Sequence, residues 1–478
     1  MTMGIAVVVL SIVAGWFLAR ALTAGAWAGP RWASLLVEVS LGALIGPGLA
    51  SVLFFVVAVA GAAGRGGALA AVALVLAVGA GVWWKFTPAV EAAPPASKGF
   101  PWAWALWICV GVGLVFLVMD FQTASSANPS GEWDAMSIWN LRARYVASGG
   151  ELWHRALSSE IGGNLGGAQH PGYPLFLSGF LATAWSAEGA FDQVVPISVS
   201  LVFAMGALIL LGASVACRKS VALGLLAWSV LLASEVFASQ AAVQYSDLLQ
   251  GFAFLATVVL LDVAADREEP RLWIAVGLAA GLACWIKNEG IPFTIAALAV
   301  AAWKSPKRGW VWIALGAAPG LVALAALKLM AQGREGVFPE TVGEAVQKIA
   351  GAGRWWQAAL GFGKAVYDAG NPWTHPVVLL VVLAMALGWV PAAERRARWW
   401  LWIPVAVTAA AEYGLYLVTT ADLDWHISTS VSRLVAQLWP SLIWLVLVML
   451  RTPEEFFAAP AAVGESKPAA RKQGRRVH

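Results

Sequence analysis

Residues 193–216 read QVVPISVSLVFAMGALILLGASVA, an apolar run without a single charged side chain. A helix of roughly 20 residues spans the hydrocarbon core of a bilayer, so this run predicts a transmembrane helix. Comparable apolar runs lie near residues 3–19, 33–61, 67–84, 102–119, 220–237, 248–265, 272–286, 290–303, 310–330, 376–392, 399–418 and 434–451. The sequence therefore predicts an all-α polytopic membrane protein with about thirteen transmembrane helices.

The composition leads to the same class. Hydrophobic residues make up 60% of the 478 residues, charged residues 12%, and the mean hydropathy is +0.73. A soluble chain has about 45–50% apolar and about 25% charged residues, so the surplus fits a surface that faces hydrocarbon. No basic stripe interleaves with aromatic residues, so nucleic acid is not an expected partner. The three cysteines all lie in apolar runs, which indicates neither a disulfide framework nor a metal site.

The positions of Lys and Arg predict the orientation. If basic clusters such as Arg218-Lys219 and Arg395-Arg396 face the cytoplasm, the N-terminus lies outside and the C-terminus inside. The stretch 174–186 is too short for a full span and is expected to be re-entrant or interfacial. The segments 120–192 and 331–375 then fall on the outer side, where we expect amphipathic juxtamembrane helices. The Ala-, Gly- and Trp-rich composition favours a bacterial inner membrane.

Three parts of the chain differ in composition. Residues 1–100 hold three apolar runs and end in a Pro- and Ala-rich linker, which predicts an N-terminal membrane module. Residues 101–451 form the expected core. The tail 452–478 is basic and polar and is predicted to be disordered and cytoplasmic. Its charge is better explained by the positive-inside rule than by specific contact with anionic lipid headgroups.

The stretch 131–145, GEWDAMSIWNLRARY, predicts an amphipathic helix along the membrane interface. Glu132 and Asp134 lie at its start, beside the membrane surface. On an α-helix, Arg142 would lie about 80° around and about 12 Å along from Asp134, so a headgroup-sized ligand could touch both. The alternative role for Asp134 is a favourable interaction with the positive N-terminus of the helix.

Other polar motifs fall on the same predicted side of the membrane. They are His170-Pro171-Gly172-Tyr173-Pro174-Leu175, Tyr245-Ser246-Asp247, Lys287-Asn288-Glu289-Gly290, Asp424-Trp425-His426 and Ser432-Arg433-Leu434. Ionisable residues at the edge of a membrane are costly unless solvated or paired, so they are candidates for substrate binding or for structural pairing. The first motif is also a plausible turn, and His426 is more often a structural hydrogen-bond partner than a catalyst.

Together with the Trp133-Asp134 pair, these motifs resemble the GT-C glycosyltransferases. The resemblance is to bacterial relatives of dolichyl-phosphate-mannose–protein mannosyltransferases and of lipid A aminoarabinose transferases. It covers roughly residues 102–450, with the first three helices as an extra module. It implies inverting transfer of a sugar from a polyprenyl-phosphate donor, at the outer membrane face, to a glycan, lipid or protein acceptor.

The resemblance also implies roles for individual residues. Asp134 matches the acidic residue of the first outer loop, which would act as general base; Glu132 is the other candidate, since Trp133 separates the two carboxylates. The residues expected to bind substrate or the donor phosphate are Arg142, His170, Tyr173, Asp247, Lys287, Glu289, His426 and Arg433.

No cofactor is predicted. No His, Cys and carboxylate spacing matches a zinc or iron site, although Glu132 and Asp134 could hold a divalent cation for a diphosphate-linked donor. A Gly-rich nucleotide-phosphate loop is also missing from the sequence, which favours a lipid-linked donor. Two other functions fit the same charges: a transporter or flippase of lipid-linked saccharides, and a non-catalytic membrane scaffold.

Overall fold

The computed structural model describes residues 2–86, 100–158, 170–332, 338–370 and 374–458, and every regular element in these ranges is a helix. Within them, nine helices are long and apolar enough to cross a membrane. They are α1 (Met3–Thr23), α2 (Arg31–Val59), α3 (Arg65–Phe86), α4 (Ala103–Ala127), α7 (Val194–Arg218), α10 (Asp247–Arg267), α13 (Gly309–Met330), the stretch Ala392–Val418, and α19 (Leu423–Val448). The stretch Ala392–Val418 comprises α17 (Ala392–Arg398), η4 (Trp399–Leu401) and α18 (Trp402–Val418). The predicted all-α membrane class is therefore confirmed.

The remaining apolar helices are shorter or bent. Helices α8 (Val221–Leu232) and α9 (Glu235–Ala242) form one apolar segment with a 68° bend, which would be a tenth span if counted as one. Helices α11 (Pro270–Ile286), α12 (Gly290–Lys304) and α16 (Pro376–Leu387) are shorter than the nine long ones. The apolar runs seen in the sequence all fall on these helices, and the total of about thirteen spans stays a prediction.

Capping residues explain where the bent segment breaks. The side chain of Ser220 accepts a hydrogen bond from the N–H of Leu223 at 3.2 Å and begins α8. The side chain of Ser234 accepts one from the N–H of Phe237 at 3.4 Å and begins α9. A serine at each of these positions satisfies an N–H group that the first turn of a helix leaves free. The cap at Ser234 therefore starts a new helix within the apolar run 220–237.

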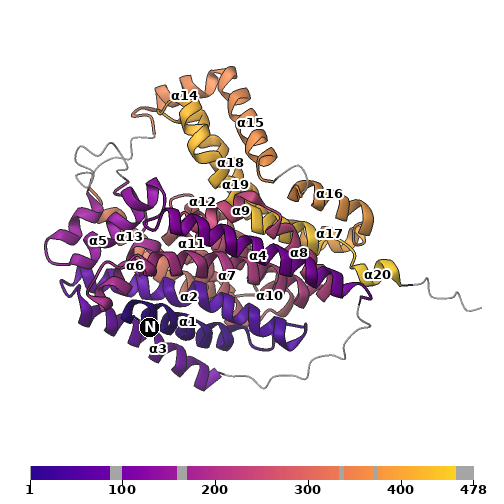
Figure 1. Cartoon of the computed structure of the whole chain (residues 1–478), viewed down its shortest axis with the longest axis horizontal. Helices are drawn as coiled ribbons and strands as arrows, with labels where there is room; N and C mark the ends of the chain where they lie inside the picture. Colours follow the sequence, from indigo (N-terminus) through magenta and orange to yellow (C-terminus); the bar gives the residue numbers. More distant parts are fainter. Residues whose placement is uncertain (1, 87–99, 159–169, 333–337, 371–373, 459–478) are drawn as a thin grey trace, which may run out of the picture.

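Glycines bring α11 and α13 into close contact. Gly277 and Gly281 are spaced four apart on α11, and Gly316 and Gly320 have the same spacing on α13. A Cβ atom at Gly320 would lie 1.9 Å from the carbonyl oxygen of Gly281, and one at Gly316 would lie 2.1 Å from that of Ile274. Small residues four apart let two membrane helices approach until their backbones touch. This pair forms part of the compact helix bundle (Figure 1).

Gly320→Val is expected to destabilise the protein by about 1–3 kcal/mol, because the new side chain forces these two backbones apart. The measurement is the midpoint of thermal unfolding of the detergent-purified protein, followed by tryptophan fluorescence. Gly111→Val is the matched control, since nothing lies within 4 Å of a Cβ at that position of α4. Equal midpoints for both variants would contradict the close packing.

Shorter helices occupy the chain between α4 and α7. They are η1 (Ala135–Trp139), α5 (Asn140–Ser148), η2 (Leu152–Leu157) and α6 (Phe176–Glu188), the last being 13 residues long and short as predicted. Helices α14 (Val342–Ala350) and α15 (Ala352–Tyr367) project beyond the bundle together with part of α18 (Figure 1). The expected interfacial segments 120–192 and 331–375 thus contain short helices.

The predicted disordered tail needs one correction. Residues Pro453–Phe457 form α20, where Thr452 and Glu455 make a reciprocal cap at the helix start. This capping box satisfies two otherwise free N–H groups, so the first residues of the tail are ordered. The basic remainder, 459–478, and the Pro-rich linker, 87–99, lie outside the described residues.

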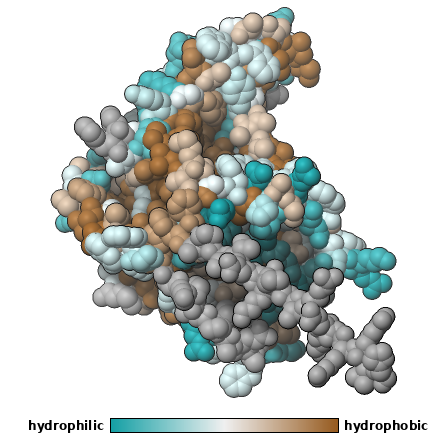
Figure 2. Space-filling view, turned by 90° about the vertical axis from the view of Figure 1, so that its right-hand side faces the viewer, coloured by the Kyte–Doolittle hydropathy of each residue, from teal (hydrophilic) through white to brown (hydrophobic). Residues whose placement is uncertain are grey.

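The end of the molecule that carries α17 and α20 shows hydrophilic and apolar side chains in separate patches (Figure 2). Here the buried Asp262 of α10 binds Arg218 of α7 at 2.7 Å and Arg398 of α17 at 3.0 Å. The two arginines lie at or beside basic clusters that were both predicted to be cytoplasmic. Their shared carboxylate confirms that these two clusters lie at one end of the bundle, at the C-terminal end of α10.

Candidate functional site

A cavity of about 540 Å³ lies at the opposite end of α10, where that helix begins. Its walls come from η1, from the segment before α6, from the start of α10, from the turn between α11 and α12, and from α18 and α19. The lining residues are Trp133, Asp134, Ile138, Trp139, His170, Tyr173, Tyr245, Asp247, Lys287, Glu289, Leu415, Tyr416, Trp425, His426, Thr429, Ser430, Arg433 and Leu434.

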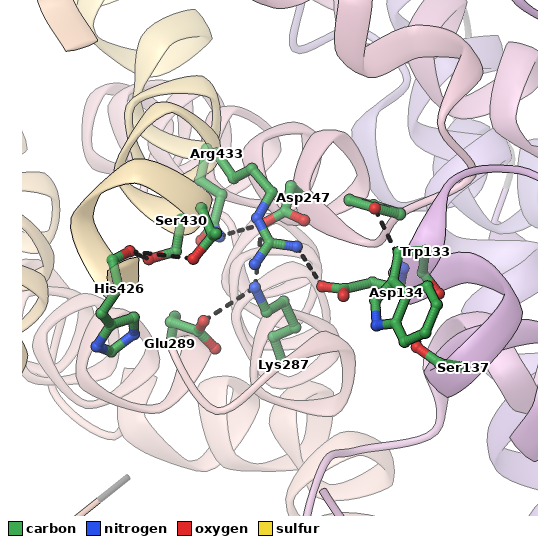
Figure 3. Close-up of polar contacts among 12 residues, drawn as sticks. Trp133, Asp134, Ser137, Asp247, Lys287, Glu289, His426, Ser430 and Arg433 are labelled. Carbon is green, nitrogen blue, oxygen red and sulfur yellow. Dashed lines mark hydrogen bonds and ion pairs between the residues drawn. The ribbon is translucent and has the colours of Figure 1, made fainter. Parts of the chain in front are cut away.

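Charged side chains form two linked groups in this cavity (Figure 3). The guanidinium of Arg433 pairs with the carboxylate of Asp134. The ammonium of Lys287 lies 3.0 Å from Oδ1 of Asp247 and 2.9 Å from Oε1 of Glu289. Both groups line the same cavity, and the close-up draws Arg433 close to Asp247 as well as to Asp134. The cavity therefore combines two cations with three carboxylates.

Helix ends position this second group. Asp247 is the first residue of α10, where the helix dipole favours a negative charge, and Lys287 directly follows α11, where it favours a positive one. Nε2 of Gln437, on α19, donates a hydrogen bond to Oδ1 of Asp247 at 2.7 Å. The side chains of Asp247 and Lys287 are 1% and 6% exposed, so their charges interact with little screening by water. Burial alone lowers the pKa of Lys287, but the carboxylates of Asp247 and Glu289 outweigh it and raise the pKa above its usual value.

In the first group, Asp134 directly precedes a π-helical turn, η1, and Arg433 belongs to α19. The backbone N–H of Asp134 donates a hydrogen bond to Oη of Tyr245 at 3.1 Å. The guanidinium of Arg433 lies over the ring of the same tyrosine, 5.2 Å from its centre. Tyr245 thus touches both partners of the ion pair and fixes their relative position. Single π-turns occur frequently at functional sites.

Tyr245 is expected to stay neutral well above pH 10, because burial raises the pKa of its phenol to about 12. A phenol whose pKa is higher in the folded than in the unfolded state favours folding below pH 10, and this contribution is lost as the pH rises toward 12. The measurement is absorbance at 295 nm, with Tyr245→Phe subtracted from the wild type. A difference signal already present at pH 10 would contradict the burial of this group.

Aromatic rings form one wall of the cavity. The ring of Tyr173 stacks on His170 at 4.3 Å between centroids and on Trp139 at 5.7 Å. Trp139 is buried, and its backbone carbonyl accepts a hydrogen bond from Ser178 of α6 at 2.9 Å. These contacts hold the segment after residue 169 against η1. A flat aromatic wall opposite charged groups suits a ligand that has both apolar faces and polar edges.

Most of the residues proposed from the sequence meet here. Eight of them line the cavity: Asp134, His170, Tyr173, Asp247, Lys287, Glu289, His426 and Arg433. His426 also contacts Oγ1 of Thr419 through Nδ1 at 3.0 Å, which fits the structural role considered for it.

Arg142 and Glu132 do not line this cavity. The side chain of Arg142 is buried, and its Nε and Nη2 donate to the carbonyl oxygens of Ala156 at 2.8 Å and Pro171 at 3.3 Å. It therefore holds the chain around η2 and the turn before α6, away from Asp134. Glu132 is exposed and accepts a hydrogen bond from Nδ2 of Asn128 at 2.8 Å. Arg142 and Asp134 are consequently not in a position to share one ligand.

Three polar residues in or near the cavity were missed in the sequence. Ser430 lines the cavity, Gln437 binds Asp247, and Glu412 lines an adjoining pocket. Glu412 and Gln437 lie within apolar runs, and Ser430 and Gln437 share the face of α19 that carries Arg433 and His426. Their spacing of three or four residues is a signal that could have found them, because it places polar groups on one side of a helix. Within the described residues, no group of three His, Cys, Asp or Glu side chains is arranged to hold a metal ion.

Comparisons of this chain with protein-family models, with curated proteins and with solved structures found no significant match.

Proposed function

We propose that this protein is a GT-C-type glycosyltransferase that transfers a sugar, with inversion, from a polyprenyl-phosphate donor. The observation that carries the proposal is the pairing of Asp134 with Arg433 beside Lys287 in one cavity. In this proposal the chain has about thirteen spans in a bacterial inner membrane, and the cavity opens on the extracytoplasmic side among amphipathic helices. The acceptor is a glycan, lipid or protein hydroxyl.

The reaction needs a base and a stabilised leaving group. The Asp134 carboxylate accepts the proton of the acceptor hydroxyl as its oxygen forms a bond to the anomeric carbon. The bond between that carbon and the phosphate oxygen breaks on the opposite face, and the polyprenyl phosphate leaves with the electron pair. Arg433 and Lys287 donate hydrogen bonds to the phosphate oxygens, which stabilises the charge that develops there.

The ion pair connects donor binding to activation of the base. Arg433 is paired with Asp134 in the structure. When the donor phosphate binds the guanidinium of Arg433, Asp134 is released from this ion pair. Its carboxylate is then able to accept a proton. The aromatic wall of Trp139 and Tyr173 supplies flat faces on which a sugar ring can rest.

Native mass spectrometry of the detergent-purified protein tests the donor class. We expect wild type to retain a polyprenyl phosphate or its glycosylated form, whose mass gives the sugar. Arg433→Gln should lose this lipid, because a guanidinium that would bind the phosphate is gone. Arg144→Gln is the matched control, since Arg144 is an exposed arginine of α5 that does not line the cavity.

Two outcomes would count against the proposal. One is bulk phospholipid alone in all three proteins after donor lipid has been added back to replace any that detergent removed. The other is equal retention of the polyprenyl lipid in wild type and Arg433→Gln. The first favours a scaffold, and the second places the lipid elsewhere on the protein.

A further inference from the structure

A second pocket adjoins the cavity and differs from it in character. It has a volume of about 370 Å³ and lies between α18, the start of α12 and Phe338. Tyr173, Glu289 and Leu415 line both spaces, so the two are neighbours with a shared wall. Most of the other residues around the second pocket are apolar, among them Pro292 and Val418.

Glu412 is the most deeply buried polar residue of this pocket. It belongs to α18, is 3% exposed, and neither of its carboxylate oxygens has a hydrogen-bond partner. Glu289 contributes a further oxygen of this kind: its Oε1 binds Lys287 at 2.9 Å, while its buried Oε2 has no partner. The pocket thus contains three carboxylate oxygens that no described group satisfies.

Unpaired buried carboxylates are costly. Burying an ionised group without a partner costs several kcal/mol, so a buried carboxyl takes up a proton unless a nearby cation with hydrogen-bond donors offsets that cost. The cations of the neighbouring cavity are already engaged, Lys287 by Asp247 and Glu289, and Arg433 by Asp134. No Lys or Arg lines the second pocket. A ligand that brings a positive group of its own would therefore stabilise the ionised form of these carboxyl groups.

The residues that line the second pocket indicate which kind of cation it can bind. A hydrated inorganic ion needs several oxygen ligands, whereas this pocket offers two carboxylates among mainly aromatic and aliphatic side chains. The amide oxygen of Asn288, which also lines the pocket, already accepts a hydrogen bond from Lys328 at 2.8 Å. An alkylammonium combines three N–H donors with a hydrocarbon chain, which matches both features. We propose that this pocket binds the ammonium group of an amphiphilic amine, with Glu412 and Glu289 as its acceptors and Pro292, Phe338 and Val418 against its chain.

This proposal goes beyond the sugar transfer and does not depend on it, because it concerns a separate pocket and is tested by binding alone. Hexylammonium is the probe, and its affinity for the full-length protein in dodecyl maltoside is measured by isothermal titration calorimetry. Hexanol is the neutral comparison. We expect hexylammonium to bind at least about tenfold more tightly than hexanol, since a charged hydrogen bond to a buried carboxylate adds to the apolar contact.

Glu412→Gln should weaken hexylammonium binding by at least about tenfold and leave the affinity for hexanol unchanged. Glu394→Gln, the same chemical change on the exposed helix α17, should bind as wild type does. Asp134→Asn should also retain the probe, which separates this pocket from the main cavity. Equal affinities for hexylammonium and hexanol, or full binding by Glu412→Gln, would overturn the proposal.

A second variant keeps the test decisive if Glu412→Gln folds poorly. Gly414 lines the pocket, and a Cβ added there meets nothing within 4 Å. Gly414→Leu should therefore fill the pocket without a clash and without changing its charge. We expect it to lose hexylammonium binding while its thermal midpoint stays within about 2 °C of wild type. Retained binding in this variant would place the probe outside the pocket.

Discussion

Asp134→Asn is expected to lower the rate of the proposed sugar transfer by about a thousandfold, because an amide cannot accept the proton of the attacking hydroxyl. The same variant should bind the donor at least as tightly as wild type. In the wild type, Asp134 competes with the donor phosphate for the guanidinium of Arg433. The asparagine of the variant carries no charge and removes this competition. The rate is measured with the lipid-linked sugar that native mass spectrometry identifies. Retention of the donor is measured by native mass spectrometry as well.

Asp192→Asn provides the matched control for this change. Oδ1 of Asp192 accepts a hydrogen bond from the N–H of Val194 at 2.9 Å, a contact that asparagine can keep. It should transfer sugar at the wild-type rate. Wild-type turnover in Asp134→Asn combined with loss in Glu132→Gln would move the base to Glu132. Donor binding without turnover in every protein, wild type included, would favour a lipid-linked-saccharide transporter.

Lys287→Met is expected to destabilise the protein by about 3–5 kcal/mol, the usual cost of removing one partner of a buried ion pair. Asp247 would keep its hydrogen bond from Gln437 but lose the cation 3.0 Å away. Because Asp247 is completely buried, water cannot take the place of that cation. The measurement is the midpoint of thermal unfolding in detergent.

Adding Asp247→Asn to this variant should restore part of the lost stability, since it removes the more deeply buried of the two carboxylates that lose their cation, while Glu289 stays without its partner. It should not restore retention of the polyprenyl lipid, because the ammonium of Lys287 is still missing. The pair of variants thus separates the structural from the binding role of Lys287. Recovery of both properties together would show that Lys287 acts only through stability, and recovery of neither would contradict the assigned ion pair.

The helical membrane class could be predicted because residues that face hydrocarbon and residues buried between helices are both apolar. Each long membrane helix therefore stands out in the sequence as a continuous apolar run. The interruptions were harder to see. Ser234 starts a new helix inside one apparent run, and Gly388 ends α16 with a φ of 71°. Both residues are small, so they barely change local hydropathy even though they redirect the backbone.

The candidate site was only partly visible from the sequence. Asp247 and Lys287 were found because they stand at the ends of apolar helices, where a charge is conspicuous. The position of Arg142 was misjudged because the sequence was treated as a regular α-helix from Asp134 onward. One π-turn, Ala135–Trp139, adds a residue to a turn and shifts the helix phase by about 100°. Arg142 consequently points into the protein.

Glu412 escaped notice for a different reason. A single carboxylate within the apolar run 399–418 hardly alters its mean hydropathy, and nothing in the sequence places it beside Glu289. Only the packing of α18 against α12 brings the two to one pocket. Long-range pairing of this kind follows from the three-dimensional arrangement of helices and not from local spacing.

The order in which the cavity's elements occur along the chain has a consequence for biosynthesis. Asp134 and Asp247 leave the ribosome first, Lys287 follows α11, and Arg433 and Gln437 arrive only with α19. Until α19 inserts, the nascent chain holds Asp134 without the cation that neutralises it in the finished protein. An unneutralised carboxylate at the membrane edge stays in contact with water. We therefore expect the region around Asp134 to remain hydrated in the insertion intermediate. Water should leave this region when the translocon releases α19 and Arg433 pairs with Asp134.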